Sequence, residues 1–463
     1  MQLNDSRVPA QRQRQRVLAP AGADHQHAQI RHVPEAYRRL AIGFSVLDPI
    51  VPGLHVRPAR GWLNDPNGLC RIDGRHHVFF QYNPDGPVHG NIHWGHVSST
   101  DLLSWQEHPC ALVPRPGGID AGGCWSGCII DDAGVPTAVY TANPGNPRDA
   151  GVALARSDRS LLHWTQGTTT VVGTPRILGI EEARDPFLFD YEGQRYAVQG
   201  TGSRDGRPQL VLYGCDDLEH WTELGPFLTD NDPIAAEIAP ANIWECPNLA
   251  RIDDRWVLLI SLWRWVDGNH PLAGVRYLVG DLVRAGEGMR FAPSSGGVLD
   301  DGPAFYAPQL LTTDGRTLLW GWAWELGRSE AQLEAAGWAG VLTFPRELFV
   351  RDGVLCSRPA AELAGLRAGD LDLAEPFTES AFELIATGPV TLRLLGEDDQ
   401  VVVAAKGTPE DPLRILLDGS MVELFDRGAS YTTRAYPTAL SRWSVEAEAE
   451  DVTGQRLAAE AAG

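Results

Sequence analysis

Residues 73–82 read DGRHHVFFQY, a tight turn followed by an apolar strand. Asp and Gly favour the turn, and runs rich in Val, Phe and Tyr between turns are typical of β-strands. The same pattern recurs four more times, at intervals of about 60 residues. The later turns are 131–134, 191–193, 253–255 and 314–316, and the strands that follow them are 136–142, 194–200, 255–263 and 316–324.

A second repeated feature supports this period. Segments that begin with Asp and end with Trp close three of the units, at 101–105, 158–164 and 217–221. Five units of four short strands predict an all-β fold, with a five-bladed β-propeller domain over 54–350. An array of β-sandwiches is the competing interpretation, and the even period favours the propeller.

The remaining chain, 351–463, has a different pattern of residues. Apolar and polar residues alternate there in short runs that are broken by Gly, Asp and Pro, which predicts a small antiparallel β-sandwich domain. The last stretch, 451–463, is expected to be frayed. The expected strands are 381–386, 390–396, 401–406, 413–418, 421–426, 430–436 and 443–450.

Composition excludes several classes of protein. The 463 residues carry a net charge of −21, which makes nucleic acid and anionic membranes poor partners. No run of 18 apolar residues predicts a transmembrane helix. The 15 Trp residues fit either a large aromatic core or platforms on which sugars stack.

The N-terminal region differs from the rest of the chain. Residues 1–53 include QRQRQR (11–16) and are predicted to be a disordered extension. Arg38 and Arg39 precede an apolar stretch that loosely resembles an export leader, but no cleavage site follows. The seven Cys residues show no repeated spacing, which indicates reduced thiols. We therefore expect a cytoplasmic protein, with export and the relevance of residues 1–50 left open.

The repeat also predicts which distant residues meet. Steps of 60 residues from Asp65 lead to Trp125, Asp185, Glu245 and Phe305. Equivalent positions near the start of the innermost strands of a propeller point into one central funnel. Three of the five are carboxylic acids, which are costly to gather unless they act in catalysis or bind a cation. The local alternative is that these acids only serve turns or a surface edge.

Paired carboxyls fit a specific chemistry. Two acids about 5 to 5.5 Å apart suit a retaining glycosidase, with one nucleophile and one acid/base. Arg184, next to Asp185, is expected to keep that acid ionised, so that it can bind sugar hydroxyls. Calcium is the alternative, but the ligands of a calcium loop lie close together in sequence, and these acids do not. No metal site is expected.

An ordered series of motifs resembles glycoside hydrolase family 32, the β-fructofuranosidases, over about 54–437. Its first part is HVRP (55–58), WLNDPNG (62–68), FQYNP (80–84), HWGH (93–96) and WSG (125–127). Its second part is RDP (184–186), ECP (245–247), FYA (305–307), GWAG (337–340), PREL (345–348) and VELF (422–425).

This resemblance implies a propeller followed by a sandwich, and it assigns roles to residues. Asp65 matches the nucleophile, Glu245 the acid/base and Asp185 the acid that binds fructose hydroxyls and stabilises the transition state. Cys246 matches a residue that tunes Glu245, or else a small apolar filler. No metal or organic cofactor is implied. The residues that match the sugar site are Asn64, Gln81, Trp125, Ser126, Arg184 and Trp322.

One departure concerns His89, where family members often carry Trp, and it leaves the shape of the substrate-side wall open. We expect His89 to be a solvated loop side chain, with binding of a leaving-group hydroxyl as the alternative. The expected reaction is hydrolysis of terminal β-D-fructofuranosides with retention, sucrose first. Fructan hydrolysis, fructosyl transfer and sucrose 6-phosphate hydrolysis remain alternatives. A non-catalytic sugar-binding propeller and an inverting pentosidase are the rivals of another class. The expected partner is a small carbohydrate, and the oligomeric state stays open.

Overall fold

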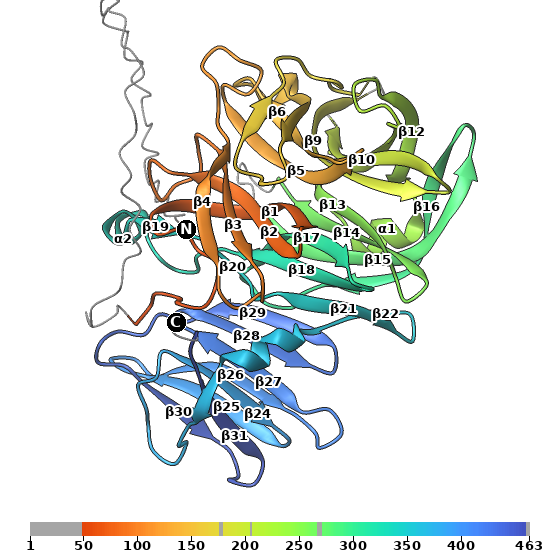
Figure 1. Ribbon diagram of the computed structural model, residues 1–463. Coiled ribbons are helices and arrows are strands. Elements are labelled where there is room, and N and C mark those ends of the chain that lie inside the picture. Colours follow the sequence, from red (N-terminus) through yellow and green to blue (C-terminus); the bar gives the residue numbers. More distant parts are fainter. Residues whose placement is uncertain (1–48, 176–178, 204–205, 266–270, 460–463) are drawn as a thin grey trace, which may run out of the picture. The chain divides into compact units, whose positions relative to one another are not determined.

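The computed structural model describes residues 49–175, 179–203, 206–265 and 271–459, all within the unit Leu47–Gly463. These residues form 31 strands and two short α-helices, so the described chain is almost entirely β (Figure 1). The expected disordered extension lies, as far as residue 48, outside the described residues.

The first two sheets follow the sequence pattern. Each hairpin turn predicted at 73–75 and 131–134 joins the first two strands of a sheet, and both turns contain a residue with positive φ. One sheet holds β1 (Gly61–Ile72), β2 (Arg75–Asn83), β3 (His93–Ser99), β4 (Gln106–Leu112) and β19 (Trp338–Ala339). The other holds β5 (Gly123–Asp132), β6 (Val135–Asn143), β7 (Gly151–Ser157) and β8 (Trp164–Gln166).

The next two strand groups join into one eight-stranded sheet through the single pair Gly202 and Ile243. The first group is β9 (Ile180–Tyr191), β10 (Gln194–Ser203), β11 (Gln209–Gly214) and β12 (Thr222–Thr229). The second is β13 (Ile243–Ile252), β14 (Arg255–Trp263), β15 (Leu272–Ala285) and β16 (Gly288–Val298). The last sheet of this region holds β17 (Phe305–Thr313), β18 (Arg316–Ala323), β20 (Val341–Leu342), β21 (Arg346–Arg351) and β22 (Val354–Pro359). All five predicted hairpins are confirmed.

The first strands of the five groups contact one another in order. Strand β1 contacts β5, β5 contacts β9, β9 contacts β13, β13 contacts β17, and β17 contacts β1 again (Figure 1). The contacts therefore close a ring, and side chains from all five strands can meet inside it.

Each of these five strands carries the same irregularity in its pairing. Two residues of the first strand oppose one residue of the second, which is the pattern of a β-bulge. The two-residue bulges are 64–65, 125–126, 185–186, 246–247 and 307–308. A bulge turns side chains out of the regular alternation, so the ring gains a repeated set of positions that point differently from their neighbours.

The strand register corrects the spacing that the sequence predicts between equivalent residues of successive units. The bulges follow one another at steps of 61, 60, 61 and 61 residues, not at a constant 60. Asp65 is the second residue of its bulge, Asp185 is the first, and Glu245 immediately precedes one. The three acids therefore belong to the same ring but do not occupy equivalent positions, because connections of unequal length add or remove single residues between units.

The two α-helices are short and locally capped. In α1 (Pro233–Ile238), the Asp232 side chain accepts hydrogen bonds from the amides of Ile234 and Ala235. In α2 (Glu330–Ala336), Ser329 and Gln332 form a reciprocal capping box, and Gly337 ends the helix at φ 74°. These side chains satisfy amides that have no partner within a helix. The two 3₁₀ turns are η1 (Pro147–Asp149) and η2 (Ala361–Leu366).

The C-terminal region forms two further sheets around an apolar core that includes Phe382, Leu392 and Trp443. The six-stranded sheet is β23 (Arg367–Asp370), β31 (Val452–Leu457), β24 (Ala381–Ala386), β27 (Leu413–Asp418), β28 (Met421–Asp426) and β29 (Ala429–Arg434). The three-stranded sheet is β26 (Gln400–Lys406), β25 (Pro389–Leu395) and β30 (Arg442–Glu446).

At three places the observed strands and hydrogen bonds extend beyond the expected boundaries. Strand β22 pairs with β21, so the sheet begun by β17 extends past residue 350 to Pro359. Residues 50–53 are bonded to the C-terminal region, since Ile50 accepts from the Ser420 amide and the Gly53 amide donates to Asp418. Residues 452–457 are not frayed, because β31 pairs with both β23 and β24.

Candidate active site

The three predicted acids lie at the bulges of three strands in the ring. Asp65 comes from β1, Asp185 from β9 and Glu245 from β13. Asp65 and Asp185 are buried, with exposed fractions of 9% and 7%, and the Glu245 side chain is 13% exposed. Burying three carboxyls together is unfavourable unless each finds partners. The contacts of each acid therefore show what the site is built to do.

Asp65 is held by several donors. Its Oδ2 accepts hydrogen bonds from the Ser126 hydroxyl at 2.7 Å and the Gln81 amide at 3.1 Å. Its Oδ1 accepts from the amide of Asn64 at 3.0 Å, and the Asn64 Oδ1 accepts from the Trp62 indole at 2.8 Å. Gln81 also donates to Ser126. The carboxylate is thus fixed in one orientation by side chains from β1, β2 and β5.

Asp185 is bound mainly by backbone groups. Its Oδ2 accepts from the Cys246 amide at 2.9 Å, while its own amide donates to Thr141 Oγ1 at 2.8 Å. The Cys246 Sγ lies 3.5 Å from both Asp65 Oδ2 and Asp185 Oδ2, so the two acids flank one thiol. Asp185 and Cys246 have φ values of 59° and 45°. This left-handed backbone is strained for residues other than glycine and is found disproportionately at functional sites.

Glu245 is the acid that Arg184 contacts. Arg184 Nη1 donates to Glu245 Oε1 at 3.0 Å, and Arg184 Nη2 donates to Glu182. The Tyr306 hydroxyl donates to Glu245 Oε2 at 2.7 Å. Both carboxyl oxygens of Glu245 therefore have a donor, and its charge has a direct ionic partner.

Burial changes the acidity of two of these groups. Burial raises the pKa of Glu245, although Arg184 and Tyr306 oppose the change. Burial and the nearby Glu245 raise the pKa of Asp185 to about 7, with Arg184 opposing. The expectation that Arg184 pairs with Asp185 and keeps it ionised is wrong, because the Arg184 guanidinium binds Glu245 and Glu182 instead. Neighbouring carboxyls that repel one another favour retention of a proton in the cluster.

Aromatic rings surround the acids. The Trp62 ring lies 5.6 Å from the Trp322 ring and 6.4 Å from the His89 ring, edge-on in both cases. His89 is exposed, in line with the expected loop side chain. The Arg184 guanidinium lies 5.3 Å from the ring centres of both Trp125 and Trp263. Flat apolar faces beside hydrogen-bonding groups are what a sugar ring requires.

All predicted site residues meet in this region, and the sequence reasoning missed others. Thr141 was missed. It is the single residue opposite the bulge of β5, just as the predicted residue Gln81 is the single residue opposite the bulge of β1. Thr141 could have been found from that equivalence. Tyr306 directly follows Phe305, the position that the constant 60-residue step selects. Glu182 could have been suspected from its spacing of two residues from Arg184, since alternate residues share a face of a strand.

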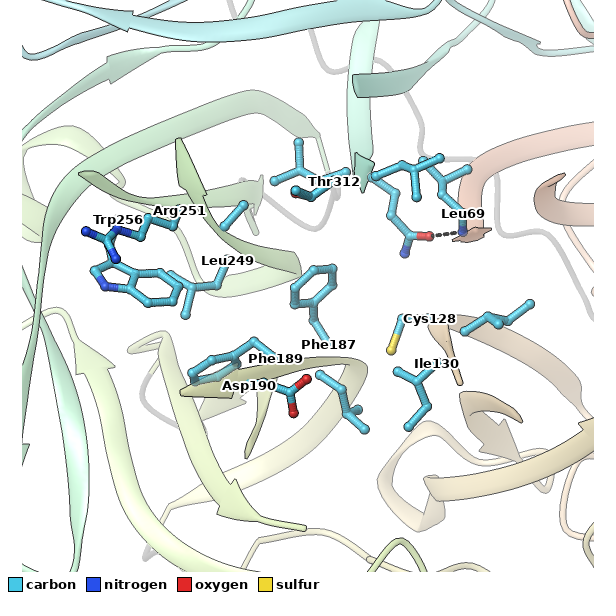
Figure 2. Close-up of a pocket in the computed structure, with 16 residues that line it drawn as sticks. Leu69, Cys128, Ile130, Phe187, Phe189, Asp190, Leu249, Arg251, Trp256 and Thr312 are labelled. Atoms are coloured by element: carbon cyan, nitrogen blue, oxygen red, sulfur yellow. Dashed lines mark hydrogen bonds between the residues drawn. The ribbon is translucent and has the colours of Figure 1, made fainter. Parts of the chain in front are cut away.

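The larger cavity in the ring lies away from the three acids. A pocket of about 500 Å³ is lined by the C-terminal halves of the five first strands, and none of the three acids lines it. Its walls are mostly apolar, with Leu69, Phe187 and Leu249 among them (Figure 2). A small void of about 10 Å³ lies next to Asp185 and Cys246 at the level of the bulges.

The described residues also bear on metal binding, disulfide formation and membrane insertion. No group of three or more His, Cys, Asp or Glu among them has an arrangement that could hold a metal ion. All seven cysteines are free thiols. None of the helices in the described ranges is long and apolar enough to cross a membrane.

Comparison with known proteins identifies similar chains. Residues 55–359 match the model of the glycosyl hydrolases family 32 N-terminal domain. A raffinose invertase of Escherichia coli is 33% identical over 88% of this chain and 95% of its own. A sucrose-6-phosphate hydrolase of Zymomonas mobilis is 32% identical over 71% of this chain and 67% of its own. The solved Bombyx mori GH32 β-fructofuranosidase is 25% identical, with a TM-score of 0.73 over 88% of this chain and 94% of that one.

Proposed function

Because the chain belongs to glycoside hydrolase family 32, we propose that it is a retaining β-fructofuranosidase that releases fructose from non-reducing terminal β-D-fructofuranosides. Sucrose is the proposed first substrate. One observation carries this proposal: Asp65 is fixed by Ser126, Gln81 and Asn64, while Glu245, whose pKa burial raises, lies in the same ring. A fixed carboxylate and a proton-holding carboxyl are the two groups that retaining hydrolysis needs.

We propose that the fold behind this site is a five-bladed β-propeller followed by a β-sandwich. The closed ring of first strands and the bulge repeated in each of them support five equivalent units. The pairing of β22 with β21 supports a catalytic domain that ends near Pro359, and the sheets from β23 onward form the proposed second domain.

In the first proposed step, Asp65 attacks the anomeric carbon of the fructosyl unit. Its carboxylate oxygen forms a bond to that carbon while the bond to the leaving oxygen breaks, and Glu245 gives its proton to that oxygen. The donors on Asp65 orient the attacking group before the substrate arrives. The Tyr306 hydroxyl and Arg184 hold the Glu245 carboxyl in place for the transfer.

In the second step, Glu245 takes a proton from water, and the water oxygen displaces Asp65 from the anomeric carbon. Two inversions at that carbon give net retention. We propose that Asp185, ionised when Glu245 carries the proton of the cluster, accepts hydrogen bonds from fructose hydroxyls and stabilises the positive charge of the oxocarbenium-like transition state. Trp62 and Trp322 are proposed to form the wall of the sugar site, with Trp125 beside Arg184.

The proposed reaction uses only the side chains of the chain, so no metal or organic cofactor takes part in it. We also propose a cytoplasmic location, since the free thiols fit a reducing compartment. Relatives of the chain are named raffinose invertase, sucrose-6-phosphate hydrolase and fructan 1-exohydrolase. These names leave three kinds of leaving group to be tested: a sugar, a phosphorylated sugar and a fructan chain.

A product assay on the purified protein tests the proposal. Sucrose, raffinose, sucrose 6-phosphate, short inulin-type oligomers and levan are supplied side by side, and fructose and the other products are quantified. Rapid release of equimolar glucose and fructose from sucrose supports an invertase. Fructose mainly from the oligomers or levan makes the protein a fructanase. No fructose from any substrate, with the fold intact, returns the argument to a sugar-binding propeller or a pentosidase.

A further inference from the structure

Glu182 is a carboxylate of the site to which the proposed mechanism gives no task. It precedes Arg184 by two residues on β9, so both side chains lie on the same face of the strand. Arg184 Nη2 donates to Glu182, while Nη1 of the same guanidinium donates to Glu245 at 3.0 Å. The three side chains are largely buried, with exposed fractions of 19% for Glu182 and 13% for each of the others.

We propose that Glu182 is a positioning residue that acts through Arg184 to keep the Glu245 carboxyl protonated at higher pH than it otherwise would be. The inference rests on the proposed acid/base function of Glu245. It assigns to this chain a second carboxylate whose task is to tune the proton donor rather than to touch the sugar.

The balance of charges around Arg184 affects the proton on Glu245. A cation beside a carboxyl favours its ionised form and lowers its pKa. Arg184 has this effect on Glu245, in opposition to burial. A second carboxylate on the same guanidinium offsets part of its positive potential at Glu245. Without Glu182, the uncompensated charge of Arg184 acts on Glu245, and the acid loses its proton at lower pH.

The guanidinium of Arg184 is held in one orientation. Its planar fork presents separate N–H groups, so one arm can be anchored while the other contacts the acid. The rings of Trp125 and Trp263, each 5.3 Å away, restrict the guanidinium further. Glu182 thus holds Arg184 in the direction that leaves Nη1 on Glu245.

Other groups around Glu245 also influence its proton, and they remain in place when Glu182 is changed. Tyr306 donates to Glu245 directly, Arg184 lies against it, and Asp65 raises its pKa. The titratable and charged groups facing Glu245 from the packed strands are Asp65 on β1, Arg184 and Asp185 on β9, Cys246 on β13 and Tyr306 on β17.

The test is the pH dependence of kcat/KM for sucrose, or for the best substrate found in the product assay. Its basic limb reports the pKa of the acid in the free enzyme. Glu182→Gln removes the charge but keeps an oxygen that accepts from Arg184, whereas Glu182→Ala removes both. Glu181→Gln is the matched control, since Glu181 is the adjacent residue and pairs with Arg148 instead, at 2.9 Å.

We expect the basic limb of Glu182→Gln to move to lower pH by about one unit, the size of effect expected from one nearby charge in a partly buried site. Glu182→Ala should show the same shift and also a lower plateau, because Arg184 is no longer held. Glu182→Asp keeps the charge, so its basic limb should lie closer to the wild-type position than that of Glu182→Gln. Glu181→Gln should keep the wild-type limb.

Two results overturn the inference. A Glu182→Gln profile that coincides with wild type shows that Glu182 does not tune the acid. A higher KM with an unmoved limb shows that Glu182 contacts the sugar. A wild-type protein without activity on any fructoside refutes the proposed function instead, so the two failures are distinguishable.

Discussion

The hydroxyl of Ser126 donates a hydrogen bond of 2.7 Å to Oδ2 of Asp65, across 61 residues of sequence. Each residue holds the second place in the bulge of its strand, so the bond joins equivalent positions of two neighbouring units. The repeat therefore supplies both the nucleophile and a residue that orients it. Glu245 and Asp185 come from the same bulge region of two other units, at different places within it.

Replacing Asp65 with Asn removes the proposed nucleophile with little change in shape. We expect the initial rate on sucrose to fall by about 10⁴-fold or more, as for other enzymes that lose a covalent nucleophile. Thermal unfolding should show that the fold remains. The control is Asp73→Asn, which changes an exposed acid in a hairpin turn. Near-normal hydrolysis by Asp65→Asn means that another group attacks the sugar.

Glu245→Ala separates the two steps of the reaction. A fructoside with an activated leaving group needs no proton, so we expect the variant to form the fructosyl-enzyme rapidly. Water then lacks its base, and the second step should be slow. A burst of leaving group followed by a slow steady rate is the expected signature. Equal losses on sucrose and on the activated fructoside argue against the acid/base assignment.

Cys246 can be tested because the sequence left two interpretations open. Its Sγ lies 3.5 Å from both Asp65 Oδ2 and Asp185 Oδ2, which favours a tuning function toward these two acids, rather than toward Glu245 as expected, over simple filling. Cys246→Ala should lower kcat by about tenfold while the melting temperature changes little, as the loss of one weak donor at a charged site implies. Cys128→Ala, a buried thiol away from the acids, is the control. If both variants lose the same activity, Cys246 is only a filler.

The hairpins and the acids could be predicted from sequence because their signals are local. Turns that contain Asp or Gly mark the hairpins, and each acid lies in a short motif beside Pro or Cys. The equivalence of the five positions could be predicted only to within one or two residues, since the connections between units vary in length. The partner of Arg184 was missed because adjacency in sequence suggested Asp185, whereas alternate residues share a strand face and bring Glu182 to the guanidinium.

Long-range contacts explain the differences at the boundaries. Residues 50–53 look disordered in sequence, but the Gly53 amide donates to Asp418, which is 365 residues away. Strand β31 was missed because its residues, VTGQRL, show only a weak apolar pattern, and pairing with β23 and β24 holds them in place. Such partners cannot be found by examining one segment at a time.

Arg346 on β21 offers a test of how the two regions are joined. Its guanidinium is fully buried and donates to Glu423 on β28 at 2.5 Å and to Asp300 at 2.7 Å. Arg346→Met leaves the buried Asp300 without its cation and Glu423 with only His55, at 3.0 Å, which should cost about 3–5 kcal/mol of stability. Denaturant unfolding measures the loss. Arg358→Met, which removes an exposed pair with Glu347, should change little. Equal losses contradict the view that the buried pair joins the regions.

A row of histidines gives a prediction for pH. The His77 Nδ1 lies 3.0 Å from the His96 Nε2, and the His96 ring is 4.5 Å from the His108 ring and 4.1 Å from the Phe79 ring. His77 and His96 are buried. Burial lowers the pKa of His77 to about 4 and that of His96 to about 2, and neighbouring histidines lower both further.

The folded chain therefore binds fewer protons here than the unfolded chain, whose histidines titrate near 6.5. Unfolding takes up protons below that pH, so the free energy of unfolding should fall as the pH falls from about 6.5 to about 4, by about 1.4 kcal/mol per pH unit for each histidine. His96→Phe, which keeps a ring against Phe79, should make that slope shallower by about one proton. Unfolding in denaturant at several pH values measures it, with His163→Phe as an exposed control. An unchanged slope in His96→Phe means that the acid sensitivity of the fold arises elsewhere.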